Sequence, residues 1–543
     1  MAEDDLPLAD LDAASAVWVQ LSSLVNQARV AGDACATNDE LRKRVEAGGD
    51  DFAPAYLLWL GDNLSRSKRS AEAVAVYAEH ADRFGAAKFG DRLWGPIALE
   101  NLARTQVAAG QPKDALATYS GLLDGPTDGS SRAWIALHAA RVAEDTIRDT
   151  ALALQWYDRA VGETDDPSQY EIPVADLAKR EAARLRSDHP WICDTMQELA
   201  ARLALAVRKP DAAALGSLAS ATHMRVGVAG SEVRFVDAER TIELLVEHFS
   251  GGALCDPSDV TGHGDKRYLA VVPATPGSPY ALMHLMLCRC SLGWEWAGVI
   301  WTLPDDALTS LMPSGDPMTN QPLPNPFLRA PWPAGISFKA GGVLNFGAEA
   351  LAVASIPFGW LLALGLSNGP AGWGPAGFYY NQFGHTGSEQ AFAIDFTRYQ
   401  QHVPLVNAAG GTPVLCVSAG VVQDLEANRP NGDPLIENRI ATNHVVTSSD
   451  WTPAALTGGD TRLRAKYLHL AGPHLIPWSL GMFVPRGIRL GLMDDTGLSA
   501  FDHLHFSVHD QNLGFQSVRI NPLDGQRLDD GDNYSVVHST NGF

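Results

Sequence analysis

The sequence predicts a multidomain protein: an α-helical repeat array, a small α+β domain and an antiparallel β-sheet domain. Three observations predict this fold class. The chain has 543 residues, which is too long for one hydrophobic core. Its first part is rich in Ala, Leu, Arg and Glu at helical spacing. Its last part consists of short β-like runs separated by Gly, Pro, Asn and Asp.

Residues 1–210 have apolar positions that recur every three or four residues, which predicts helices throughout. Within them, a small residue followed four positions later by Tyr lies on one helical face and favours close packing. The pairs are Ala73 with Tyr77, Ala115 with Tyr119, and Ala153 with Tyr157. Over roughly residues 54–165 this pattern resembles tetratricopeptide repeats, which implies a concave surface for a protein partner. A generic helical bundle is the alternative.

Residues 216–312 change character and predict a small α+β domain. Strands are expected at Met224–Ala229, Tyr268–Val272 and Trp294–Trp301. A helix is expected at Asp237–Phe249. Nothing in this composition assigns the domain a function.

Prolines recur over residues 313–333, which predicts a semi-rigid linker. Residues 334–543 then predict an antiparallel β domain, and a fragment starting near Leu323 is expected to fold by itself. The expected strands are Pro413–Val422, Asn443–Thr447, Tyr467–Leu470, Ile488–Leu492 and Leu504–Val508.

Charge and composition exclude several classes of partner. The net charge of -22 argues against nucleic acid, because phosphate binding needs clustered Lys and Arg. The acidic N-terminus lacks an apolar signal core, which makes the cytoplasm the default location. Residues 350–366 are apolar, but they fall short of the roughly 20 residues of a membrane span and contain Pro357. A buried insertion is therefore expected there.

The chemistry is concentrated in the last third of the chain. His503 and His505 alternate with Leu504 and Phe506, so the two histidines are expected on one face of a strand. Asp395 stands between Ile394 and Phe396, and a buried carboxylate in such a strand costs several kcal/mol, on the order of a lost ion pair, unless it is paired. A Zn²⁺ ion is the natural partner for such an acid.

Two more histidines complete the pattern. His385 lies in a loop flanked by Gly384 and Gly387, and His469 lies in the alternating run Tyr467–Leu470. The order His, Ile-Asp-Phe, Tyr-x-His-Leu, His-Leu-His-Phe resembles the lysostaphin/LytM family of zinc endopeptidases over about residues 375–525.

This resemblance implies that His385, Asp395 and His505 bind Zn²⁺ and that His469 and His503 act in catalysis. Three departures from the family pattern are visible in the sequence, and one is the segment Asp450–Arg464, which looks like an insertion ahead of Tyr467. Nine residues separate the first His from the Asp, and Phe501-Asp502 stands where Gly-Pro usually precedes His-Leu-His.

Three functions are consistent with these motifs. The first is an active zinc endopeptidase that cuts peptidoglycan cross-links or Gly-rich peptides. The second is a catalytically silent scaffold that binds wall peptides. The third is an intracellular peptidase whose protein substrate is delivered by the helical repeats, which the missing signal favours. Retention of all five motif residues favours activity over the silent scaffold.

Overall fold

The computed structural model describes most of the first 301 residues and shorter stretches of the remainder. The residues described are 11–49, 51–90, 92–125, 131–163, 174–186, 191–219, 223–228, 231–262, 264–273, 283–290, 292–301, 337–340, 394–400, 403–404, 411–429, 442–449, 452, 463–497, 499–500, 502–510, 516–518 and 536–538. The expected linker over 313–333, the apolar segment 350–366 and His385 lie outside these residues.

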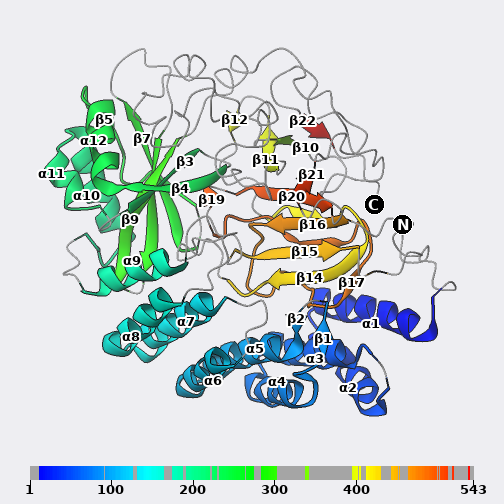
Figure 1. Ribbon diagram of the computed structural model, residues 1–543. Helices are drawn as coiled ribbons and strands as arrows, with labels where there is room; N and C mark the ends of the chain where they lie inside the picture. Colours follow the sequence, from blue (N-terminus) through cyan, green and yellow to red (C-terminus); the bar gives the residue numbers. More distant parts are fainter. Residues whose placement is uncertain are drawn as a thin grey trace.

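The predicted multidomain organisation of helices and antiparallel sheets is confirmed, and its N-terminal part is a curved array of antiparallel helices (Figure 1). The first helix begins where the Asp12 carboxylate accepts a hydrogen bond from the Ser15 amide at 2.9 Å. The helices are α1 (Ala13–Val30), α2 (Asn38–Ala47), α3 (Ala53–Arg66), α4 (Ser70–Phe84), α5 (Trp94–Ala108), α6 (Pro112–Asp124), α7 (Arg132–Arg141), α8 (Thr150–Gly162) and α9 (Val174–Arg186). A short hairpin, β1 (Lys88–Phe89) and β2 (Arg92–Leu93), precedes α5.

Small residues and tyrosines pack the helix pairs together as the repeat pattern predicts. A Cβ added at Gly61 would lie 2.6 Å from the ring of Tyr77, so only glycine lets α3 and α4 approach this closely. The Tyr77 hydroxyl donates to Asp62 at 2.5 Å. Further along the array, the Tyr157 hydroxyl donates to Glu144 at 2.7 Å. The tyrosines therefore fill the gap between helices and end on a carboxylate.

The central domain is an α+β unit whose sheet follows the predicted strands. The β3 and β9 strands are parallel, and the other pairs are antiparallel. The helices α10 (Met196–Arg208) and α11 (Ala212–Gly216) pack in the core of this domain and not in the core of the helical array. Judged by packing, the array therefore ends before α10. The remaining elements are β3 (His223–Val228), β4 (Ser231–Asp237), α12 (Ala238–His248), β5 (Ala253–Leu254), β6 (Val260–Thr261), β7 (Lys266–Pro273), β8 (Met283–Cys290) and β9 (Gly293–Trp301).

The C-terminal domain is an antiparallel sheet with the order β17-β14-β15-β16-β20-β11-β10-β22. The expected strand at Pro413–Val422 is two strands, because the chain turns at residues 416–419. The strands are β10 (Ser337–Ala340), β11 (Ile394–Gln400), β12 (Val403–Pro404), β13 (Pro413–Leu415), β14 (Gly420–Glu426), β15 (His444–Ser448), β16 (Leu463–Leu468), β17 (Phe483–Val484), β18 (Arg489–Leu492), β20 (Leu504–Asp510), β21 (Gln516–Val518) and β22 (Val536–His538). A further strand, β19 (Ser499–Ala500), leaves this domain and pairs with β4 of the central sheet.

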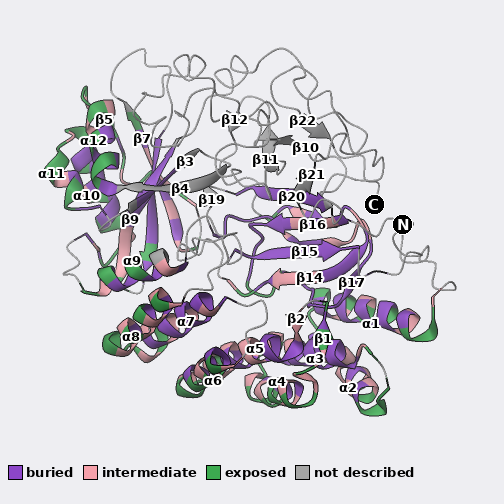
Figure 2. Cartoon of the chain, viewed as in Figure 1, coloured by how far each residue is buried: buried purple, intermediate pink, exposed green. Residues whose placement is uncertain are grey.

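The helical array and the β domain share one hydrophobic core. Buried residues run from α1 and α3 into β14, β15 and β17 without a break (Figure 2). The indole N–H groups of Trp18 and Trp59 donate to the carbonyls of Gly481 and Leu480, at 2.8 and 2.9 Å. Removing the helices would expose an apolar surface that is buried in the full chain, so whether the β domain folds by itself stays a prediction to be tested.

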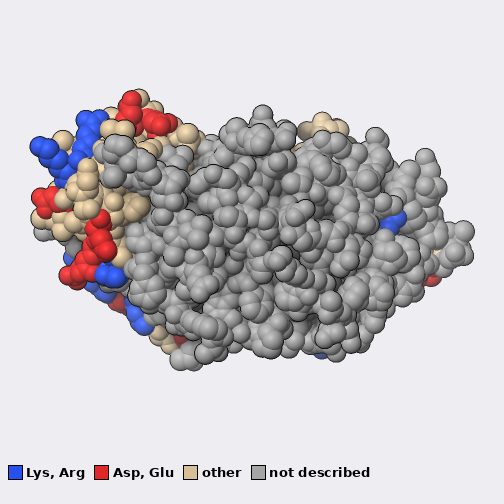
Figure 3. Space-filling model, turned by 90° about the horizontal axis from the view of Figure 1, so that it is seen from above, with Lys and Arg blue, Asp and Glu red and all other residues tan. Residues whose placement is uncertain are grey.

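Surface features of the described residues fit an ordinary globular exterior. No helix in that part of the chain combines the length and apolar character needed to cross a membrane. Where described side chains appear in the view from above, over the central domain, acidic and basic groups alternate (Figure 3). These described side chains do not form a field of one sign.

Candidate active site

Three of the five residues singled out in the sequence form a buried cluster of imidazoles. His469, His503 and His505 are each 0% exposed. The ring centroids of His469 and His503 are 4.5 Å apart, and those of His469 and His505 are 6.1 Å apart. Burying three histidines together is costly unless they share a function, because each imidazole brings polar nitrogens into a low dielectric.

The sheet register brings the fourth residue beside this cluster. Asp395 on β11 is the direct antiparallel partner of His505 on β20. Residues directly opposite each other in such a ladder belong to the same face of the sheet. On its other edge β20 pairs with β16, where Leu468 is the partner of His505, and His469 follows immediately. The cluster therefore sits where β11, β20 and the end of β16 meet.

His469 is held in a fixed orientation by the backbone of a distant loop. Its Nδ1 lies 2.6 Å from the Thr496 carbonyl oxygen, which can only accept, so Nδ1 carries the proton. The Thr442 hydroxyl donates to the same carbonyl at 2.6 Å. This tautomer leaves a lone pair on Nε2, the nitrogen that could accept a proton.

The predicted strand position of His469 is wrong. The β16 strand ends at Leu468, and His469 has a φ of +62°. Few residues other than glycine adopt this left-handed conformation, and it costs about 1–3 kcal/mol unless the surroundings enforce it. The bond to Thr496 and the bond from the Asp494 amide to the His469 carbonyl, at 2.8 Å, are the enforcing contacts.

His503 precedes the strand that carries His505. The regular strand begins at Leu504, while His503 forms an isolated bridge to Asp494. Leu504 and Phe506 are 0% exposed and belong to the shared apolar core. The predicted alternation is therefore present, with apolar side chains in the core and histidines on the opposite side.

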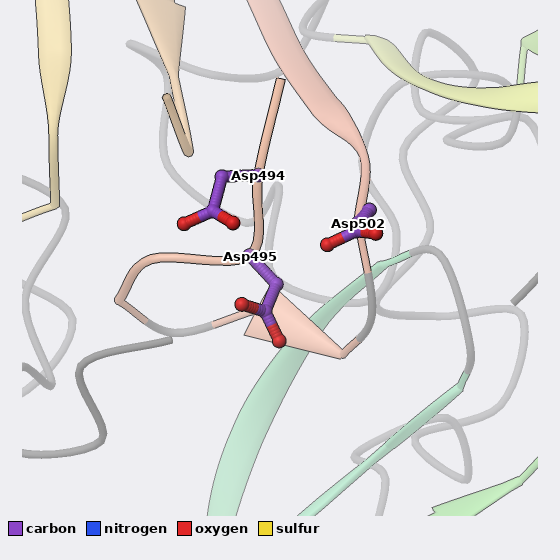
Figure 4. A group of neighbouring side chains, drawn as sticks. All are labelled: Asp494, Asp495 and Asp502. Carbon is purple, nitrogen blue, oxygen red and sulfur yellow. The ribbon is translucent and has the colours of Figure 1, made fainter. Parts of the chain in front are cut away.

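Sequence reasoning missed two kinds of residue at this site. Thr442 and Thr496 orient His469, and only Thr496 had a signal, as part of the glycine-rich approach to the His-Leu-His run. The second kind is acidic: Asp494, Asp495 and Asp502 lie next to the histidines, with carboxylate oxygens within 4.8 Å of one another (Figure 4). The adjacent pair Asp494-Asp495 is the signal that could have pointed to them.

The residues present fit a zinc ion by the chemistry of their donors. Imidazole nitrogen and carboxylate oxygen are ligands that Zn²⁺ takes in catalytic sites. His505 is buried, and its register partner on β11 is Asp395, so the sheet offers one imidazole and one carboxylate at adjacent positions.

Comparison with known proteins finds resemblances among solved structures. The sequence matches no family model, and no curated protein matches it. A variant catalytic domain of the M23 protein EnpA from Enterococcus faecalis is 19% identical, covering 23% of this chain and 73% of that one, with a TM-score of 0.16. The catalytic domain of lysostaphin from Staphylococcus simulans is 21% identical, covering 22% and 68%, with a TM-score of 0.15.

The helical array has its own neighbour. A kinesin light chain protein with tetratricopeptide-like repeats from Podosopora anserina is 15% identical, covering 32% of this chain and 87% of that one, with a TM-score of 0.26. The two resemblances expected from the sequence, to M23-type peptidases and to tetratricopeptide-like repeats, are thus both found among solved structures. What the protein does has to be argued from its own site.

Proposed function

We propose that this chain is a zinc-dependent endopeptidase. The observation that carries the proposal is one juxtaposition: the register pair of Asp395 and His505 beside the buried rings of His469 and His503. In this proposal Asp395, His505 and His385 hold the ion. When bound, zinc supplies Lewis acidity toward a peptide carbonyl and lowers the pKa of water toward about 7.

The chain's own histidines would move the protons. In neutral His469 the Thr496 carbonyl would hold the proton on Nδ1, so Nε2 would accept a proton from the attacking water. His503, whose ring centroid lies 4.5 Å from that of His469, is placed to donate to the oxygen of the peptide carbonyl as charge develops there. The enforced φ of His469 keeps this geometry without further reorganisation.

We propose peptidoglycan cross-links or Gly-rich peptides as the substrate class, on the strength of the motif resemblance alone. The scaffold alternative has one observation in its favour. A cavity of about 470 Å³ lies between α3, α5 and the segment that follows His469, lined in part by Asp62, Arg66 and His474. A partner peptide bound there would give the helical array a recognition role without any hydrolysis.

Metal analysis of the full-length protein separates these functions. Wild type is expected to hold one zinc ion per chain, and Asp395→Ala and His505→Ala should lose it. His469→Ala should keep the metal while hydrolysis of an oligoglycine peptide or of purified peptidoglycan falls by about 10²–10⁴.

His474→Asn is the matched control. His474 is an exposed histidine with a φ of +68°, which asparagine tolerates, so zinc content and hydrolysis should both stay unchanged. Wild-type protein that takes up no zinc after reconstitution would refute the proposal. Zinc-loaded protein that cuts neither substrate would favour the scaffold.

A further inference from the structure

The acidic trio beside the histidines has no role in the proposed peptidase chemistry. Asp494, Asp495 and Asp502 are 1%, 1% and 2% exposed. They come from the loop over residues 494–502 that joins β18 to β20, and their side chains surround a common space (Figure 4). Carboxylates this close together repel one another when they are ionised, and a bound cation relieves that repulsion.

One atom in this trio points to a missing ligand. The Oδ2 of Asp495 accepts a hydrogen bond from the Tyr268 hydroxyl at 3.0 Å. Its Oδ1 is buried and makes no hydrogen bond in the described part of the chain. A buried carboxylate oxygen without a donor is rare in folded proteins and calls for an ion or a water.

The donors and their spacing select the kind of ion. Carboxylate oxygens are hard ligands that suit Ca²⁺, Mg²⁺ or Mn²⁺, whereas imidazole suits Zn²⁺. Three atoms within 4.8 Å of one another surround a point that is at most about 2.8 Å from each. This upper limit leaves room for the roughly 2.3–2.6 Å of Ca²⁺–oxygen bonds. Mg²⁺ dehydrates reluctantly and usually keeps several waters, so a set of buried carboxylates favours Ca²⁺.

We propose that Asp494, Asp495 and Asp502 form a second cation site, separate from the zinc ligands, that takes Ca²⁺. The ion would fasten the loop that connects both candidate catalytic histidines. Asp494 donates its amide to the His469 carbonyl at 2.8 Å, and Asp502 directly precedes His503. The central domain holds the same loop, because Lys266 donates to the carbonyls of Asp495 and Gly497 at 2.6 and 2.7 Å.

The test counts ions on the zinc-loaded full-length protein. Mn²⁺ is the spectroscopic probe, and its free signal in electron paramagnetic resonance reports binding. One Mn²⁺ per chain is expected, displaced by Ca²⁺, and Ca²⁺ should raise the melting temperature by mass action. Asp495→Asn should weaken Ca²⁺ binding at least about tenfold, since it removes one of the three charges, and Tyr268→Phe should weaken it less. Zinc content, measured in parallel, should not change.

Asp124→Asn is the control, because Asp124 is an acid on α6 whose side chain is 73% exposed, and this variant should bind Ca²⁺ as wild type does. Wild type that binds neither Mn²⁺ nor Ca²⁺ at about 1 mM free ion would overturn the proposal, as would Asp495→Asn with wild-type affinity. The inference does not depend on hydrolysis: Ca²⁺ binding by a chain without zinc or activity would refute the proposed function and leave this site standing.

Discussion

The helical array and the central domain contact the β domain in different ways. The array holds residues 474–483 through the shared apolar core and through side-chain donors to backbone carbonyls, as when Arg29 donates to Pro477 at 3.0 Å. The central domain holds the 494–502 loop through the buried Lys266, the Tyr268 hydroxyl and main-chain pairing between β19 and β4. The first contact buries apolar area, and the second fixes the backbone of a short loop.

The difference suggests that one contact stabilises the β domain and the other positions the residues of the candidate site. Each of the two interdomain contacts lies next to one candidate catalytic histidine in the sequence. Residues 474–483 follow His469, and the loop over 494–502 directly precedes His503. The apolar contact should dominate stability, because burial contributes about 25 cal/mol per Å². The polar contact between the central domain and the 494–502 loop should mainly fix the position of that loop, because buried hydrogen bonds contribute little net energy but demand a specific geometry.

Removing the array should have the largest effect. A chain that starts at residue 187 keeps the central and β domains, with α10 included, but exposes the apolar residues that α1 and α3 cover. We expect it to aggregate or to lose cooperative unfolding, as judged by gel filtration and by thermal denaturation followed with circular dichroism. A soluble, cooperatively folded fragment that retains zinc would show that the shared core is dispensable.

A single substitution at the centre of the same contact should cost less. Trp59 is 0% exposed, and its indole bonds the Leu480 carbonyl across the domain boundary. Trp59→Ala should lower the free energy of unfolding by about 3–5 kcal/mol, measured by urea denaturation. Trp156→Ala on α8 is the comparison, because Trp156 is only partly buried and packs beside Arg159. Equal losses for the two variants would contradict the importance assigned to the boundary.

Lys266→Met tests the polar contact between the central domain and the 494–502 loop. Lys266 is 0% exposed, and losing its ammonium leaves two carbonyls without this donor, at a cost of about 1–3 kcal/mol. If this contact positions the loop, kcat for hydrolysis should fall strongly while the melting temperature changes little and the zinc content is retained. Lys209→Met, an exposed lysine at the end of α10, is the control. Activity that merely tracks the loss of stability would reduce Lys266 to a structural role.

Local periodicity explains what the sequence could predict. The spacing of Ala73 and Tyr77 is contained within one helix, and the alternation from His503 to Phe506 is contained within one strand. Each signal needs only neighbouring residues, so the helices, the strands and the His-Leu-His face could be predicted from it.

The contacts that complete the site have no local signal. Lys266 and Asp495 are 229 positions apart, and Arg29 and Ser479 are 450 apart. The error at His469 has the same origin, because its left-handed backbone is enforced by Thr496, which belongs to another segment. A propensity argument for residues 467–470 cannot include a carbonyl that arrives from a different loop.

The smallest effect should come from a pair near the array contact, at His444 and Asp424. Burial lowers the pKa of His444, but the hydrogen bond and charge of Asp424, whose oxygen lies 3.5 Å from Nε2, outweigh it, so the pKa lies above its ordinary value of 6.5. The pKa of His444 is higher in the folded protein than in the unfolded chain. Below the unfolded-state pKa, the protonated His444 paired with Asp424 therefore contributes its full stabilisation. This contribution is lost as the pH rises through the folded-state pKa. Asp424 is 42% exposed, so solvent screens the pair and the effect stays small. His444→Gln should therefore reduce the free energy of unfolding in mildly acidic buffer and approach wild type in alkaline buffer, as measured by urea denaturation across pH. A difference that grows with rising pH would mean that His444 is neutral in the folded protein and that burial outweighs Asp424.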